Sequence, residues 1–375
     1  MARIIHIVPS MPPEINGLGD YAHQLWRYWP EPRPEWHIAG SRVPEGAQQA
    51  WPEVQIHRFQ LNEKSLAGVL ANVRAEVAIL HYVGYAYARR GAPMWMPVAL
   101  ADWKRGTGAN LVVMFHELYA TGPPWRSEFW MKPLQRRIVT QLLGLADRWI
   151  CSCRRQRQIL VEELRADPSL GALIPIGSNI DPIRSPEWAR PWPLSIGKKL
   201  RIVAFGQGIT RLRSLRAHQN LLRELCRRDL VESVLLLGKS EGAGPVNSEI
   251  DRLVKKIGCG ALCQESYDVS SAAISEQLLD RHLGLLSNPY GILTKSGVFA
   301  AYCSHGVISL IPGSGYASND PFISNFDSRP NECAQALTGP EARRSLEATR
   351  DFSSGLSWRS IASAWKAHMP ARPSE

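Results

Sequence analysis

Lys295, Ser296 and Gly297 are the residues whose types and spacing could most directly bind a charged ligand. They lie in the stretch Leu285–Leu310, whose pattern favours an apolar strand, a loop, a helix that opens at Lys-Ser-Gly and a second apolar strand. The start of such a helix presents backbone N–H groups and the positive end of the helix dipole, and Lys295 adds a full charge. The stretch therefore predicts a phosphate site, although Ser296 could equally be an ordinary N-cap and Lys295 a solvated loop residue.

A second candidate site follows the first predicted strand, Arg3–Val8. Gly17 and Gly19 carry no Cβ, so the backbone there could approach a ligand closely; the alternative is a plain turn. Asp20 comes directly after them and is a candidate general base. Its alternative is a first-turn acid that interacts with the helix dipole. These three residues define a candidate site, with Asp20 as its chemically reactive group.

Two further groups of polar residues follow predicted strands. His116 and Glu117 come after Leu111–Phe115, and the carboxyl end of a parallel strand is where such folds place ligand-contacting residues. The alternative for His116 is a structural loop histidine. Another group, Gln207, Arg211 and Arg213, follows the strand Arg201–Phe205; taken alone, its arginines indicate a solvated helix start, and an anion site there is what the family resemblance given below implies.

Composition limits the class of protein. The chain has 375 residues, which exceeds the usual size of a single core and favours two domains. No window is long and apolar enough for a membrane span, and residues 1–9 read as a strand rather than a signal peptide. Seven scattered cysteines indicate reduced thiols without zinc or disulfides. A net charge of +10 suggests an anionic partner.

Strand-like and helix-like segments alternate along the chain, which predicts doubly wound α/β domains. Four prolines between residues 181 and 193 predict an interdomain connection. We expect an N-terminal domain over residues 1–185, a linker over 186–198, a C-terminal domain over 199–353 and a last helix over 354–375 that could pack back on the first domain. No internal repeat is visible in the sequence.

Several of these motifs resemble nucleotide-sugar-dependent glycosyltransferases of the GT-B fold, in the group related to glycogen synthase and the bacterial mannosyltransferases (glycosyltransferase family 4-like). The resemblance rests on the glycine loop after the first strand, on the Phe-His-Glu segment at 115–117, on the Ala-Asp element at 146–147, on the Ile-Pro segment at 174–175 and on the Gly-Gln-Gly turn at 206–208. It implies two Rossmann-like domains that face each other across a cleft. It implies that His116 meets the donor sugar at the reaction centre, and inversion would also need a base, for which Asp20, His116 and Glu117 are the candidates. It also implies that the donor phosphates meet the loop at Gly17 and Gly19 and the positions of Gln207 and Arg213, with Arg211 close by. Lys295, Ser296 and Gly297 complete the expected donor site by their own chemistry.

The stretch Leu285–Leu310 departs from that group. When it is aligned on Gly306, the two glutamates of the group's Glu-x7-Glu motif fall at Leu293 and Ala301. Neither carboxylate is present, which puts the usual ribose and sugar contacts, and retention of configuration, in doubt. Gln207 and Arg213 stand where the group has arginine and lysine. Diphosphate binding is therefore better supported by the sequence than ribose recognition.

The expectation is an enzyme that moves a sugar, a hexose by resemblance, from a nucleoside-diphosphate sugar to an acceptor hydroxyl, in glycolipid, polysaccharide or glycoconjugate synthesis. It would need neither a metal nor a cofactor. Aromatic and basic residues interleave over 125–138, so a cytoplasmic protein at the inner surface of an anionic membrane is one expectation, with a lipid-linked or saccharide acceptor; inward packing of the aromatics is the alternative. Two other functions remain open: a non-catalytic GT-B-like partner or scaffold, and a nucleic-acid-binding protein suggested only by charge and aromatic content.

Overall fold

The computed structural model describes residues 3–14, 16–120, 127–189, 191–240, 242, 244–313, 322–325 and 329–370. The chain divides into two compact units. Unit 1 consists of Met1–Pro175 and Trp358–Glu375, and unit 2 of Ile176–Ser357. The segment predicted as a linker, 186–198, belongs to unit 2. It is held there because the Nε1–H group of Trp192 donates to the carbonyl of Leu337 at 2.7 Å.

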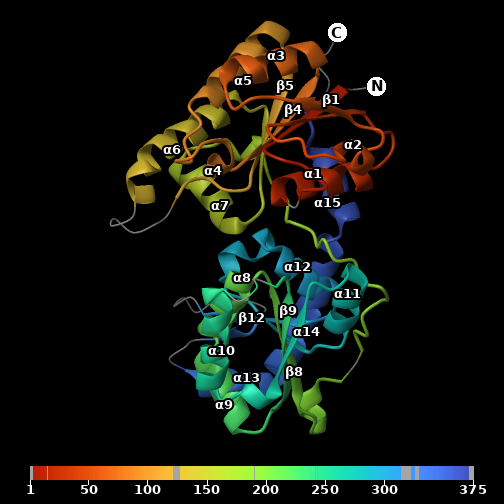
Figure 1. The fold of residues 1–375 in the computed structure, drawn as a ribbon, viewed down its shortest axis with the longest axis vertical. Coiled ribbons are helices and arrows are strands. Elements are labelled where there is room, and N and C mark those ends of the chain that lie inside the picture. Colours follow the sequence, from red (N-terminus) through yellow and green to blue (C-terminus); the bar gives the residue numbers. More distant parts are fainter. Residues whose placement is uncertain are drawn as a thin grey trace. The chain divides into compact units, whose positions relative to one another are not determined.

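Unit 1 is built on a seven-stranded sheet in which every pair of neighbours is parallel, in the order β3-β2-β1-β4-β5-β6-β7 (Figure 1). The strands are β1 (Arg3–Val8), β2 (Glu35–Gly40), β3 (Gln55–Arg58), β4 (Val77–Tyr82), β5 (Asn110–Phe115), β6 (Arg148–Cys151) and β7 (Gly171–Leu173). The helices are α1 (Gly17–Tyr28), α2 (Ala47–Ala50), α3 (Glu63–Val73), α4 (Gly84–Tyr87), α5 (Trp95–Thr107), α6 (Ser127–Leu145), α7 (Arg154–Gln158) and α15 (Trp358–His368).

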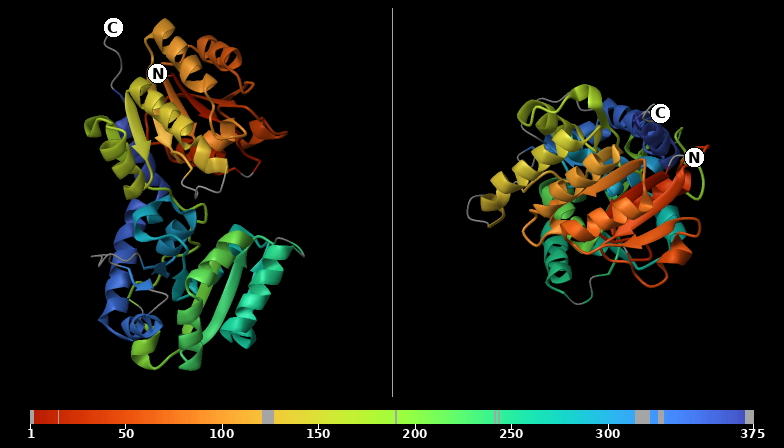
Figure 2. Two further views of the ribbon diagram at one scale, coloured as in Figure 1. Left: turned by 90° about the vertical axis from the view of Figure 1, so that its left-hand side faces the viewer. Right: turned by 90° about the horizontal axis from the view of Figure 1, so that it is seen from above.

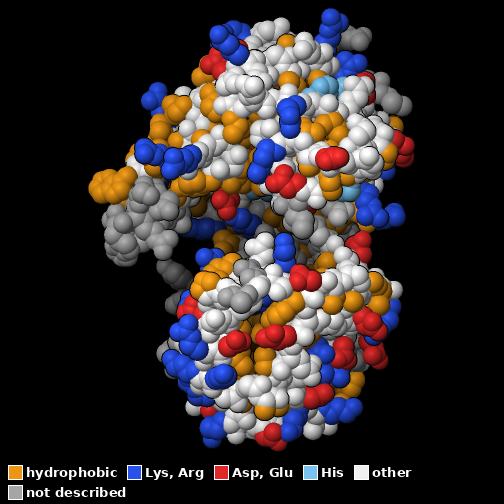
Figure 3. Space-filling model, viewed as in Figure 1, with side chains coloured by type: hydrophobic (Ala, Val, Ile, Leu, Met, Phe, Trp, Pro, Cys, Tyr) orange, Lys and Arg blue, Asp and Glu red, His pale blue; other side chains and the backbone are white. Residues whose placement is uncertain are grey.

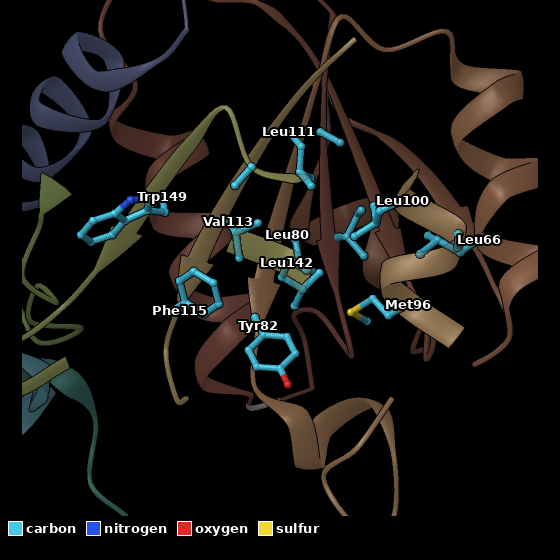
Figure 4. Packing of buried hydrophobic residues seen from close by; sticks show 14 of the residues in the cluster. Leu66, Leu80, Tyr82, Met96, Leu100, Leu111, Val113, Phe115, Leu142 and Trp149 are labelled. Carbon is cyan, nitrogen blue, oxygen red and sulfur yellow. The ribbon is translucent and has the colours of Figure 1, made fainter. Parts of the chain in front are cut away.

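The two faces of this sheet differ in chemistry. Because side chains alternate along a strand, Leu80 and Val113 point to one face while His81 and Met114 point to the other. The first face packs against α3, α5 and α6 in an apolar core that includes Leu66, Leu100 and Leu142 (Figure 4). Helices α1 and α15 contact each other on the second face, which we call the histidine face.

Unit 2 has a second parallel sheet, in the order β10-β9-β8-β11-β12-β13, with helices on both sides (Figure 2). Its strands are β8 (Leu200–Gly206), β9 (Val231–Gly238), β10 (Cys263–Tyr267), β11 (Leu283–Leu285), β12 (Ile308–Pro312) and β13 (Ser324–Asn325). Its helices are α8 (Gly208–Ala217), α9 (Gln219–Arg227), α10 (Pro245–Ile257), α11 (Ser271–Leu279), α12 (Gly297–Ser304), α13 (Pro330–Thr338) and α14 (Pro340–Gly355).

One predicted helix of unit 2 is wrong in a way that matters for the site. The sequence pattern predicts a single helix over 214–228, but the structure has α8 and α9, which are separated at His218. The backbone of His218 is not helical, and its ring is buried with Nε2 at 2.7 Å from the carbonyl of Leu286. Because α8 begins at Gly208, Arg211 and Arg213 lie inside a helix and not in a turn before one.

Candidate functional site

Two glycines bring β8 and β9 close together at their carboxyl ends in unit 2. Gly206 and Gly238 both have positive φ angles, 122° and 137°, which favour glycine. A Cβ on Gly238 would lie 2.2 Å from the carbonyl oxygen of Gly206, so no larger residue fits there. The next residue after Gly206 is Gln207, the N-cap of α8, whose side chain makes no capping hydrogen bond. The first turn of α8 thus lacks a side-chain cap where the two strands end, an arrangement suited to an anion.

Arg211 lies one turn into α8 and is fully buried. Its Nη1 donates to the carbonyls of Gly206 and Lys239, and the guanidinium lies over the ring of Tyr267, 4.6 Å from the centroid. Its Nε and Nη2 are buried without a hydrogen-bond partner among the described residues. A buried charge with unsatisfied donors is costly, so an anion that binds at this strand end would be strongly favoured.

The other predicted donor-binding residues of unit 2 are not all gathered around Arg211. Arg213 is exposed, and two positions along a helix point in opposite directions, so Arg211 and Arg213 do not share a face. Lys295 is half-buried at the end of the 3-10 turn Tyr290–Lys295. Ser296 is the N-cap of α12, since its Oγ accepts from the N–H of Phe299 at 3.2 Å. Gly297 is exposed, with open space where a Cβ would lie.

Leu293 and Ala301 are both buried in an apolar cluster of unit 2. These are the two positions at which the resembling family has glutamates. That cluster also contains Tyr302, whose hydroxyl donates to the carbonyl of Val203 at 3.2 Å and accepts from the N–H of Phe205 at 3.0 Å. The α12 region is therefore tied to β8 by apolar packing and a buried tyrosine, without the two carboxylates.

In unit 1 the glycine loop is organised by packing. Asn16 caps α1, with its side chain accepting from the N–H groups of Leu18 and Gly19. A Cβ on Gly19 would lie 2.4 Å from the carbonyl oxygen of Ser10, so this glycine is needed for the helix to approach the loop after β1. Gly17 has open space around its Cα. The structural requirement at Gly19 is thus a backbone contact within unit 1.

Asp20 lies in the first turn of α1, and its N–H donates to the carbonyl of Asn16 at 2.8 Å. Burial raises the pKa of the Asp20 carboxyl to about 6, although a hydrogen bond to this carboxyl from the backbone of Asn16 opposes the shift. A carboxyl with a pKa near the working pH can accept a proton from a substrate hydroxyl. Asp20 is the described carboxyl of unit 1 that the structure best prepares for that role.

His116 follows β5 and is buried, whereas its neighbour Glu117 is exposed. The N–H of His116 continues the sheet by donating to the carbonyl of Tyr82, and its own carbonyl accepts from Gln156 Nε2 at 2.8 Å. The His116 ring also meets the edge of the Tyr21 ring, 5.1 Å away between centroids. His116 and Asp20 are therefore both fixed on the side of the sheet where α1 packs.

The sequence analysis missed two histidines of this face, His6 and His81. They lie on β1 and β4, and Nδ1 of His81 is 3.1 Å from Nε2 of His116. Each of the three histidines follows an apolar run on a predicted central strand, as in Ile-Ile-His, Ile-Leu-His and Met-Phe-His. This repeated pattern could have predicted that the three histidines meet, because neighbouring parallel strands bring their carboxyl ends together.

The predicted aromatic and basic segment lies on α6, except that Trp125 and Arg126 fall outside the described residues. Trp130 is 72% exposed and meets the ring of Phe129 at a centroid distance of 5.6 Å. Arg136 and Arg137 are exposed as well, and Lys132 lies over the ring of Tyr119. Inward packing therefore accounts for residues such as Gln135 and Ile138, but not for Trp130.

Other features bear on the predicted chemistry. All seven cysteines are free thiols. In the part of the chain that the structure describes, no group of three or more His, Cys, Asp or Glu side chains is arranged to hold a metal ion. No described helix is both long enough and apolar enough to cross a membrane.

Comparisons with known proteins found similarity in structure alone. No family model matches the chain, and neither does any curated protein sequence. The sucrose-phosphate synthase of Thermosynechococcus elongatus superposes with a TM-score of 0.66 at 12% identity, over 98% of each chain. HepE of Anabaena, solved with UDP, gives 0.65 at 11% identity, over 98% of this chain and 99% of that one.

A Listeria monocytogenes protein assigned as a UDP-N-acetylglucosamine 2-epimerase gives a TM-score of 0.56 at 12% identity, over 98% of this chain and 96% of that one. Identities this low establish a shared fold and leave the chemistry to the site. The two parallel α/β units and these matches over nearly the whole length confirm the predicted fold class: the chain has the GT-B fold.

Proposed function

We propose that this protein is a glycosyltransferase that moves a sugar, a hexose in the simplest case, from a nucleoside-diphosphate sugar to an acceptor hydroxyl. The observation that carries the proposal is Arg211 in the first turns of α8, a fully buried guanidinium whose Nε and Nη2 have no partner within the described part of the chain. A diphosphate is the anion that fits this chemistry, because it brings charge and several acceptor oxygens to one place. One fold relative supports it: HepE was solved with UDP and with UDP-glucose.

The chemistry needs no metal in this proposal. Negative charge develops on the departing diphosphate, and fixed cations and helix dipoles can stabilise it. Arg211 and the first turn of α8 form the core of that site, with Gln207 at its edge and Lys295, Ser296 and Gly297 as further donor contacts. Arg213, which lies on another face of α8, is left outside this core. Transfer should therefore persist in the presence of EDTA; loss of transfer that Mg²⁺ restores would contradict this part.

Unit 1 supplies the acceptor chemistry in the proposal. Asp20 serves as the base for the acceptor hydroxyl, because burial raises the pKa of its carboxyl to about 6. His116 contacts the sugar, and Gly17 and Gly19 shape the loop in front of α1. Glu117 is a weaker candidate because it is exposed. A base of this kind corresponds to inversion at the transferred sugar.

We also propose that the protein associates with a membrane surface. The exposed Trp130 with Arg136 and Arg137 on α6 forms an aromatic and basic surface of the kind that rests on anionic lipid headgroups. The protein would then work at the inner surface of the cytoplasmic membrane, on a lipid-linked or saccharide acceptor.

Calorimetry with UDP, GDP and ADP is the first test, followed by mass spectrometry of products from the matching nucleotide sugars. We expect one nucleoside diphosphate to bind and its sugar to be transferred to an added acceptor. Since one fold relative is assigned as an epimerase, UDP-N-acetylglucosamine without acceptor is a required control. A changed sugar in that control would favour epimerisation, and no binding of any nucleotide would favour the scaffold.

Nucleic-acid binding is the weakest alternative. On the face drawn in Figure 3, lysine and arginine side chains are interspersed with acidic ones and do not gather into one basic field. A binding surface for the phosphate backbone needs such a field. Salt-sensitive binding to random DNA without nucleotide binding would overturn the proposed function in favour of this one.

A further inference from the structure

His6, His81 and His116 form a chain of hydrogen-bonded imidazoles across three neighbouring strands of unit 1. Nδ1 of His6 lies 2.9 Å from Nε2 of His81, and Nδ1 of His81 lies 3.1 Å from Nε2 of His116. The strands β1, β4 and β5 are adjacent and parallel, so the three rings stand on the same face of the sheet. The same pair of ring atoms is used at both links.

The chain is enclosed by aromatic rings. The His6 ring stacks on Trp36, with centroids 4.6 Å apart and an angle of 13° between the rings. His81 lies against Tyr21 and Trp365, at centroid distances of 5.7 and 6.3 Å. Burial lowers the pKa of His6 to about 3 and lowers the pKa of His81 well below its ordinary value. Both rings are therefore neutral at physiological pH, with one N–H each.

Neutral rings linked in this way have only two proton arrangements. In the first, Nδ1–H of His6 donates to His81, Nδ1–H of His81 donates to His116, and His116 carries its own proton on Nδ1. In the second, every proton lies on Nε2 and each ring donates in the opposite direction. A mixed arrangement places two N–H groups or two lone pairs against each other, so the three tautomers change together.

The environment of His6, at one end of the row of imidazoles, distinguishes the two arrangements. Nε2 of His6 is buried and has no hydrogen-bond partner among the residues that the structure describes. The second arrangement would put an N–H at this atom, whereas the first leaves only a lone pair there. Orphaned buried N–H groups are the rarer of the two in proteins. The first arrangement is thus favoured.

We propose that His81 and His6 are positioning residues that hold His116 as a neutral imidazole with its proton on Nδ1, so that His116 does not act as the base of the reaction. The part that concerns the reaction rests on the proposed function, in which His116 contacts the donor sugar. The general base is then another group, and Asp20 is the described carboxyl whose burial suits it.

The test is ¹⁵N NMR of the full chain labelled at histidine, because the shifts of the two ring nitrogens report the tautomer directly. We expect His6, His81 and His116 all to carry the proton on Nδ1 at pH 7.5. A proton on Nε2 of His116, or signals of a positively charged His116 ring, would overturn the proposal. The measurement needs no substrate, so it decides the tautomer even if no nucleotide binds and the proposed function fails.

Variants of His81 can separate a role in positioning the His116 ring from a role in packing. His81→Leu removes both hydrogen bonds of the row and places an apolar side chain of similar size there. We expect the His116 ring to lose its single tautomer. The matched control is His57→Leu, because His57 and His37 form another hydrogen-bonded pair on the same sheet, 2.9 Å apart, that does not reach His116. If the His116 signals of a folded His81→Leu variant are unchanged, the hydrogen-bonded histidines do not set the tautomer of His116.

If transfer is measurable, the same variant gives a second readout. We expect His81→Leu to raise KM for the nucleotide sugar about tenfold and to leave the pH at which the rate falls unchanged, since the base is a different residue. A shift of that pH midpoint would assign the proton transfer to His116 and overturn the proposal.

Discussion

The guanidinium of Arg211 lies 4.6 Å from the centroid of the Tyr267 ring, and its Nη1 donates to two carbonyls at the ends of β8 and β9. If this charge attracts the diphosphate, Arg211→Met should lower the affinity for the nucleoside diphosphate at least tenfold, about 1.4 kcal/mol. Calorimetry measures the change. The control is Arg216→Met, because Arg216 is exposed on the same helix and pairs with Glu249. Equal affinities in the two variants would refute a role for Arg211.

The pKa of Asp20 gives a prediction for stability. Because burial raises the folded-state pKa to about 6, above the value of about 3.9 for an unfolded carboxyl, folding favours the protonated form. Ionisation of Asp20 therefore costs stability as the pH rises through about 6. Asp20→Asn should raise the free energy of unfolding at pH 8 and leave it unchanged at pH 4.

Urea denaturation at the two pH values measures this difference, and the same variant should lose transfer activity if Asp20 is the base. Equal stabilisation at both pH values would mean that Asp20 is not the carboxyl whose ionisation is resisted.

Trp130 provides a test of the α6 surface. Its side chain is 72% exposed, so Trp130→Ala should leave the unfolding temperature unchanged while it reduces binding to vesicles that contain anionic lipid. Co-sedimentation with such vesicles measures the binding. Leu61→Ala removes another exposed apolar side chain of unit 1 and serves as the control. The membrane proposal fails if wild type does not sediment, or if both variants lose binding equally.

Two glycine substitutions should have opposite effects on stability. A Cβ on Gly284 in β11 would lie 2.4 Å from the ring of Tyr302, which is itself buried and hydrogen-bonded, so Gly284→Ala should cost about 1–3 kcal/mol. Gly144 lies within α6 with open space where a Cβ would lie, and Gly144→Ala should gain about 0.5–1 kcal/mol. Thermal unfolding checks both signs.

Ala301→Glu tests whether the missing motif could simply be restored. Ala301 is 1% exposed in an apolar cluster with Leu293 and Phe299, so a carboxylate there would be buried without a partner. We expect a loss of more than about 3 kcal/mol in the free energy of unfolding and no gain in nucleotide affinity. Tighter nucleotide binding in a folded variant would show that this position reaches the ligand.

Much of the fold could be predicted from strand patterns. The apolar runs predict β1, β4 and β6 with the bounds that the structure gives them, because buried parallel strands are apolar on both faces. The short strand β7 and the strand β10 were missed. β10 has the sequence Cys-Gln-Glu-Ser-Tyr and is half exposed at the edge of its sheet, so it lacks the apolar signal.

The sequence points to strand ends and helix starts as the place of the site, and that placement stays a prediction. What the sequence could not show was burial. Arg211 and Arg213 look alike in sequence, and only the start of α8 at Gly208 makes one of them fully buried and the other exposed. His6 and His81 were missed since a histidine within a strand carries no sign of which neighbour it will meet.

The position of α15 has a consequence for how the chain is made. Its residue Trp365 donates from Nε1 to the hydroxyl of Tyr21 at 2.8 Å, so the last described helix covers the first one. A ribosome that has released residues 1–175 has not yet synthesised this cover, and all of unit 2 must emerge first. During that interval the histidine face would expose aromatic side chains, as a binding site for chaperones would require. Of the two units, unit 1 thus begins to be made before unit 2 and is completed after it.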